Sequence, residues 1–345
     1  MPSITFDLET VTPLFLAGAD QQKAELRPPA FRGALRYWFR AIAGQYYSND
    51  LEKLRELEAS ILGDTTEKNG ASKIIIRLRN IPSNFCTYEH ESSEKTGLNY
   101  LWFSLEMNSR KAIDAEIPFS VEFSTRPNPK YRKRQEKNLL IAANCFWLAV
   151  NLGGFGSRER RGAGSLRVKR ITSQGLDERK LQGLPRFDIK FKAKDIERYF
   201  SSQINKVQNN FRILLKCQDE GTIDFNTLPS MEIFNPSFCK VSWLRKSYFS
   251  WEQALDEIGK KYSSHREQYP LQKRVIFGLP LKKVDMQSRY PSPLRIKIVR
   301  SVNDYYCFLI RTYTDFPVSE NIESSSKFDI VDEFVENLEN VGQVV

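Results

Sequence analysis

The feature that most constrains the fold is a long apolar run that ends in a glycine-rich, basic stretch. Residues 135–152 are apolar nearly all round at helical spacing, which predicts a helix buried on every side. The next twelve residues, 153–164, contain five glycines and three arginines. Residues 165–171 alternate apolar and basic side chains and predict a strand. Other elements of the chain must therefore cover the helix on all sides.

The preceding residues predict a small sheet that can supply part of this cover. Strands are expected at residues 4–15, 73–78 and 117–123, and an extended segment at 100–105. Helices are expected at residues 30–44, behind Pro28-Pro29 and stopped by Gly44, and at residues 51–62. If residues 51–62 are an insertion, the order is β-α-β-β-α-β, the ferredoxin-like pattern shared by RNA-recognition folds.

The second half has a weaker pattern. Strands are expected at residues 186–191, 273–279, 292–299 and 305–313, and helices at 251–262 and 328–341. Residues 196–215 fit either one helix or a mixture of extended and helical pieces, and residues 175–185 are a candidate linker. A second α+β sheet domain fits this order, and a degenerate copy of the first domain is one form it can take.

The charge distribution favours a polyanionic partner. The chain carries a net charge of +10, and residues 126–170 alone hold twelve bases against two acids. Such an excess suits nucleic acid, although a solvated basic face is the alternative. From Glu320 onward the chain holds seven acids and one lysine, which predicts either a solvated acidic face or a second surface that docks a basic neighbour.

The glycine-rich loop is the strongest candidate for that contact. Its glycines let the backbone approach a ligand, and exposed N–H groups form a nest for phosphate oxygens. Arg158, Arg160 and Arg161 add forked donors suited to phosphate. The spacing does not fit a Walker loop, and the helix-then-strand order is the reverse of a dinucleotide fingerprint. A flexible hairpin with incidental charge is the alternative.

The predicted first helix supplies a second candidate. Arg32, Arg36 and Arg40 lie four residues apart and form one stripe beside the apolar face. Arg27 precedes the helix, whose free N–H groups together with Arg32 form a possible anion site. The alternative is a solvated stripe paired with acids.

The sequence offers little for catalysis. His90 and His265 are the two histidines, neither stands near a triad or metal cluster, and both are expected at the surface. The five cysteines are far apart, so no disulfide framework or zinc site is expected and a cytoplasmic location fits. No apolar run is long enough to span a membrane. We expect no catalytic residue, metal or cofactor, although scattered carboxylates of a metal-dependent nuclease stay open.

Several segments together resemble the RAMP superfamily of CRISPR systems, and more narrowly the family of subunit one of the Cmr (type III-B) effector complex. They are residues 12–20 and 25–40, the loop 153–164 with Ser165-Leu166, residues 277–280 and residues 292–298. Ala163 is small where relatives often carry a bulkier apolar residue.

The resemblance implies an α+β protein of two ferredoxin-like (RRM-like) domains with helical insertions, at residues 1–175 and 176–345. It implies a non-catalytic subunit that binds guide RNA near its 3′ end, engages target RNA and contacts other RAMP subunits. The phosphate-contacting helix start maps onto Arg32 and Gly33. The full set of expected RNA-binding residues is Arg27, Arg32, Gly33, Arg36, Gly153, Gly154, Gly156, Ser157, Arg158, Arg160, Arg161, Gly162 and Gly164. Two alternatives remain: a metal-independent endoribonuclease that matures guide RNA, and a subunit that touches only protein.

Overall fold

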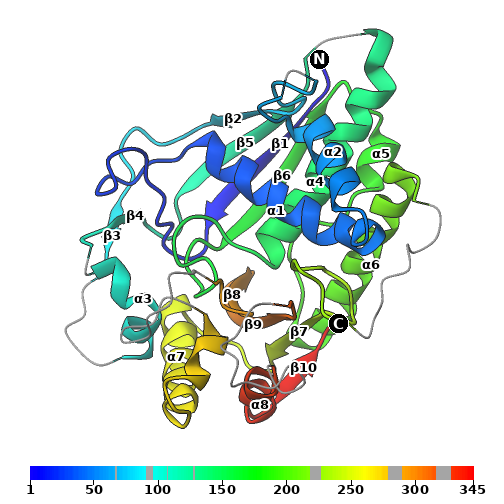
Figure 1. Cartoon of the computed structure of the whole chain (residues 1–345). Coiled ribbons are helices and arrows are strands. Elements are labelled where there is room, and N and C mark those ends of the chain that lie inside the picture. The colour runs from blue at the N-terminus through cyan, green and yellow to red at the C-terminus, as the bar shows by residue number, and fades with distance from the viewer. Residues whose placement is uncertain are drawn as a thin grey trace.

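The chain folds around two four-stranded antiparallel sheets, one from each half of the sequence (Figure 1). The computed structural model describes residues 1–66, 68–90, 96–106, 108–126, 129–217, 227–278, 290–315 and 328–345. Within that part of the chain, no helix has both the length and the apolar composition to cross a membrane.

The first sheet confirms the β-α-β-β-α-β prediction. Its strands are β1 (Ser3–Thr10), β2 (Ile75–Arg79), β5 (Pro118–Ser124) and β6 (Leu166–Gln174), in the spatial order β2-β5-β1-β6. The two helices of the pattern are α1 (Pro28–Tyr47) and α4 (Arg132–Asn151). Two insertions follow α1 and β2: α2 (Leu51–Leu62), and the unit β3 (Thr87–Glu89), α3 (Gly97–Glu106) and β4 (Lys111–Ile113).

The second sheet repeats this topology without a repeat in the sequence. Its strands are β7 (Cys239–Leu244), β8 (Leu294–Ser301), β9 (Asp304–Thr312) and β10 (Val341–Gln343), in the order β10-β7-β9-β8. Helix α7 (Trp251–Glu267) follows β7, and α8 (Asp329–Glu336) follows β9. Both sheets thus place their first and third strands in the middle, as ferredoxin-like folds do. The fold class predicted from the sequence is confirmed.

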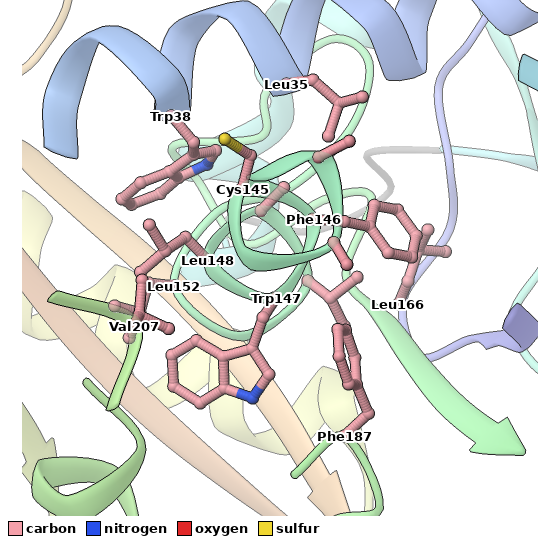
Figure 2. Close-up of a cluster of buried hydrophobic side chains, with 14 of the residues drawn as sticks. Leu35, Trp38, Cys145, Phe146, Trp147, Leu148, Leu152, Leu166, Phe187 and Val207 are labelled. Carbon is pink, nitrogen blue, oxygen red and sulfur yellow. The ribbon is translucent and has the colours of Figure 1, made fainter. Parts of the chain in front are cut away.

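Helix α4 is the centre of the first core. Figure 2 shows α4 end-on, with Leu35 and Trp38 of α1 on one side and Phe187 on the other. Residues 196–215 form one helix, α6 (Ile196–Leu215). Its Val207 also packs there, so α6 closes this core. The short helix α5 (Glu178–Gln182) occupies the candidate linker.

Each half of the sequence contributes one helix to the core of the other half. Helix α6 belongs to the second half of the sequence and packs beside α4 of the first half. Helix α3 is inserted in the first half and packs against α7 of the second half. Trp102 of α3 stacks on Trp251 of α7 with ring centroids 5.5 Å apart. Neither sheet therefore completes its core from its own strand-and-helix unit alone, and the domain boundary at residue 175 stays a prediction.

Several sequence expectations were wrong in detail. The extended segment expected at 100–105 is α3, and the strand expected at 273–279 begins as a 3₁₀ helix, Lys273–Phe277. Residues 186–191 form no strand and contribute one isolated bridge. Gly44 does not stop α1; a β-carbon there would lie 3.3 Å from the Ile233 side chain, so its small size permits close packing. Each error reflects tertiary packing that overrides local preference.

The acidic C-terminal region faces its own sheet at one position. Asp332 of α8 accepts hydrogen bonds from Lys240 at 3.0 Å and from Arg311 at 2.7 Å. Part of the charge expected to dock a neighbour is thus used within the chain. Glu320 and Glu323 lie outside the described residues.

The contact between α3 and α7 predicts a stability difference between two glycine substitutions. A β-carbon at Gly259 would lie 2.1 Å from the carbonyl oxygen of Gly97, whereas one at Gly33 would meet nothing within 4 Å. Gly259→Ala should lower the free energy of unfolding by about 1–3 kcal/mol through overpacking. Gly33→Ala should raise it by about 0.5–1 kcal/mol by favouring helix α1. Urea denaturation of both variants measures the difference, and equal effects would contradict the close approach.

Candidate nucleic-acid interface

The glycine-rich loop is tightly fixed, in contrast to the flexible hairpin that was the alternative. Gly156 and Gly164 have φ values of +81° and +65°. A β-carbon at Gly156 would lie 2.4 Å from the carbonyl oxygen of Phe15. The backbone N–H of Ser157 donates to that same oxygen at 2.8 Å, and the N–H of Gly164 donates to Pro13 at 2.9 Å. Only glycine allows the loop to lie this close to residues 13–15.

Arg160 points into the protein. Its two terminal nitrogens donate to the carboxylate oxygens of Glu232 at 2.6 and 2.8 Å, and one also donates to the carbonyl oxygen of Ser292. Burial alone would raise the pKa of Glu232, but the Arg160 charge and hydrogen bonds outweigh it and lower that pKa to about 2. The Tyr37 hydroxyl donates to the same carboxylate. This is a buried, bidentate ion pair.

Arg161 is likewise bound inside the chain. Its guanidinium donates to the carbonyl oxygen of Leu294 and to the hydroxyl of Tyr262, both at 3.0 Å, and lies 4.9 Å from the Tyr262 ring centroid. The backbone N–H of Ile296 in β8 donates to the carbonyl oxygen of Arg160, the preceding loop residue, at 3.1 Å. The loop thus joins the edge of the second sheet. The expected phosphate contacts of Arg160 and Arg161 stay untested, but their side chains are occupied by protein groups.

Arg158 differs from the other two loop arginines because its described side-chain contacts are with helix α3 and not with the second half of the chain. Its Nε donates to Ser104 Oγ at 2.9 Å, and its guanidinium lies 5.1 Å from the ring centroid of Phe103, which is 47% exposed. No carboxylate of the described chain pairs with it. Burial lowers the pKa of Arg158 to about 10, so it is protonated at neutral pH. Within the described ranges, no acidic side chain offsets its charge.

Arg110 is a cation beside the loop that the sequence did not single out. It donates to Ser157 Oγ and to Gln21 Oε1, both at 2.8 Å, and has no carboxylate partner among the residues described. It lines a cavity of about 260 Å³ together with Gly156, Ser157 and Lys111. Arg110 lies 47 positions before Ser157 in a polar turn. No spacing rule connects the two, so only the fold could have found it.

The start of α1 lies against the same loop, because the Phe31 ring packs on the Phe155 ring with centroids 4.9 Å apart. Just before the helix, Arg27 donates to the carbonyl oxygen of Ala17 at 3.2 Å, and Ala17 lines the cavity. Arg32 is half-buried, its Nε has no partner within the described chain, and Gly33 is exposed.

The arginine stripe expected on α1 divides into two parts. Arg36 donates to Glu58 and to the carbonyl oxygen of Leu62, and Arg40 lies 3.5 Å from the same Glu58 carboxylate. These two arginines thus connect α1 to the inserted helix α2, as the paired alternative anticipated. Arg32 stays on the loop side.

The expectation of two surface histidines was wrong. His90 and His265 are both 5% exposed. The ring of His90 packs beside Tyr88 and Trp102, and His265 Nε2 hydrogen-bonds the carbonyl oxygen of Ile330. Within the described ranges, no cluster of three or more His, Cys, Asp or Glu side chains is arranged to hold a metal.

The RAMP superfamily model matches residues 7–167, which include the loop and the start of α1. The Pyrococcus furiosus protein named CRISPR system Cmr subunit Cmr1-2 is 33% identical over 180 residues, 48% of this chain and 95% of that protein. From the same organism, CRISPR system Cmr subunit Cmr1-1 is 28% identical over 327 residues, 89% of this chain and 86% of that protein.

Solved structures show the same fold over nearly the whole chain. The crystal structure of apo Cmr1 from Pyrococcus furiosus covers 99% of this chain and 98% of its own, with a TM-score of 0.69 and 22% identity. A cryo-EM structure of the type III-B Cmr-beta bound to cognate target RNA covers 97% of this chain and 99% of its own, with a TM-score of 0.66 and 14% identity.

The buried Arg160–Glu232 pair predicts acid sensitivity. Because the folded state lowers the pKa of Glu232 from 4.5 to about 2, the resulting stability is full above pH 4.5 and is lost as the pH falls through about 2. Glu232→Gln should lower the free energy of unfolding at neutral pH by about 3–5 kcal/mol, because Arg160 stays buried without its counter-charge.

The matched measurement is unfolding of the parent and the variant between pH 7 and pH 2. The parent should lose stability faster than Glu232→Gln as the pH falls below 4.5. Parallel curves would show that this pair is not the acid-sensitive contact.

Proposed function

Because this chain belongs to the RAMP superfamily, in its Cmr subunit-one group, we propose that it is a non-catalytic RNA-binding subunit of a type III-B CRISPR effector complex. It holds the guide RNA near its 3′ end and helps to engage target RNA in antiviral defence. Its other partners are neighbouring RAMP subunits. We infer a cytoplasmic location, which agrees with the five unpaired cysteines.

One observation carries the proposal: two arginines that have no carboxylate partner in the part of the chain that the structure describes flank the fixed backbone of the loop. Arg110 donates to the Ser157 hydroxyl and Arg158 is the next residue along the chain. Their remaining donors suit phosphate oxygens. Arg27 and Arg32 add charge from the start of α1, which packs on the loop.

Backbone recognition suits this role for a physical reason. A guide RNA differs in sequence from one target to the next, so the subunit must read charge and shape rather than base edges. A rigid glycine loop does this when it lies beside guanidiniums that no described carboxylate neutralises, because the position of the phosphates is independent of base identity. The role of Arg160 and Arg161 in this interface is to fix the loop against the second sheet.

The endoribonuclease alternative has little support in the described side chains. Acid–base cleavage of RNA uses a group placed near the substrate, and both histidines are packed among aromatic rings. A purely structural subunit predicts no salt-dependent RNA affinity. Both alternatives are therefore distinguished by one binding experiment whose products are also run on a gel.

Removing Arg110 and Arg158 should weaken binding through lost phosphate contacts. For single-stranded RNA, each contact contributes about 0.7 to the slope of log affinity against log salt concentration. Arg110→Ala/Arg158→Ala should therefore reduce the slope by about 1.4 without altering base preference. The measurement is a titration of fluorescently labelled single-stranded RNA at several salt concentrations, and the RNA should remain intact.

The control is Lys194→Ala/Arg198→Ala, which removes the same charge from exposed positions, one just before α6 and one in its first turn. That variant should keep the parent's slope. Equal losses in both variants would indicate a general charge effect, and cleaved RNA would favour the nuclease alternative.

A further inference from the structure

A second basic cavity lies at the opposite end of α4 from the glycine-rich loop. It has a volume of about 630 Å³ and is bordered by the segment before β2, the end of β5 and the first turn of α4. Because α4 has 20 residues, the two ends of this helix are about 30 Å apart. Figure 1 shows that the start of α4 lies near the N-terminus of the chain, on the side of the molecule away from the second sheet.

The lining of this cavity is cationic. Lys73, Arg126 and Arg134 contribute three positive charges, and none of the described residues that line the cavity is a carboxylate. Arg126 and Arg134 are exposed, and no ion pair with either occurs among the described residues. The nearby carboxylate of Glu136 is already held by Arg132 and Lys180. The site therefore has uncompensated charge.

The start of α4 adds the positive end of the helix dipole to these cationic side chains. Tyr131 occupies the N-cap position without a side-chain hydrogen bond, and the first turn holds no acid. Its residues are instead Arg132, Lys133 and Arg134. Cations at this end of a helix are destabilising unless an anion is present. A bound phosphate would offset this repulsion, because the positive end of the helix and the arginines both attract an anion.

An unpartnered buried hydroxyl provides an independent indication of a ligand. Thr125 is 1% exposed and lines the cavity, yet its Oγ1 has no hydrogen-bond partner in the part of the chain described. A buried hydroxyl without a partner costs free energy, so such groups usually have a ligand or water. Tyr131 also lines the cavity and is 48% exposed, beside these cations.

We infer that this cavity is a second contact for single-stranded RNA, with a phosphate held by Arg126, Arg134 and the start of α4 and a base stacked on Tyr131. The inference rests on the proposed function and extends it to a strand that reaches both ends of α4. An exposed aromatic ring among cations fits a nucleotide better than a phosphorylated side chain, because a nucleotide supplies both the ring and the charge.

The test uses the full chain and labelled oligouridylate of about sixteen nucleotides, long enough for several contacts. Arg126→Ala/Arg134→Ala should reduce the salt slope by about 1.4. Tyr131→Ala should weaken affinity about tenfold with an unchanged slope, and Tyr131→Phe should bind like the parent. Lys194→Ala/Arg198→Ala is again the charge-matched control.

A second measurement does not depend on variants. Oligouridylate containing 4-thiouridine, crosslinked to the unmodified chain, should attach within residues 126–138. Crosslinks confined to other residues, or parent-like affinity in the Tyr131→Ala or the double arginine variant, would overturn the inference. Weakened binding in Arg110→Ala/Arg158→Ala would still support the proposed function, so the two can fail separately. Preference for a phosphopeptide over the RNA would also overturn it.

Discussion

The arrangement of the two sheets depends on placing two loop guanidiniums inside the protein. Burying an arginine is costly unless its charge and donors are satisfied. Glu232 satisfies Arg160 with two hydrogen bonds, and carbonyl and hydroxyl oxygens satisfy Arg161. Because Glu232 precedes β7 and the Arg161 partners include Leu294 in β8, the loop of the first half is held by groups of the second. The junction is therefore specific, since only matched donors and acceptors make it stable.

This junction changes what the basic composition means. Residues 126–170 hold as much net charge as the whole chain, and counting alone assigns that charge to a ligand surface. The structure uses Arg160 and Arg161 internally and Arg36 to hold α2, which leaves Arg110 and Arg158 beside the loop. The electrostatic surface is consequently set by the cations that the fold does not use for internal contacts. Charge density along the chain overestimates it.

The exchange of helices explains how two similar small units form one body. Each sheet repeats the same strand order, but α6 completes the core around α4 and α3 completes the core around α7. A four-stranded sheet with two helices leaves apolar surface uncovered, and burial of that surface favours folding. Here the inserted or connecting helix of one half provides the cover for the other. The two halves are thereby joined through packing as well as through the loop.

The local pattern of apolar residues in the sequence determined where the strands β1, β5, β8 and β9 and the helices α1, α2 and α4 form. It also identified the glycine loop, because glycine spacing reports a backbone conformation that other residues cannot adopt. Side-chain direction within the loop was decided by the tertiary structure, since Glu232 lies 72 positions away from Arg160. The same is true of α3, whose aromatic residues suit a strand until Trp251 covers them, and of Arg110, which meets Ser157 only in the folded chain. Periodicity records which residues are buried, but the partner of a buried charge is a long-range contact with no local signal.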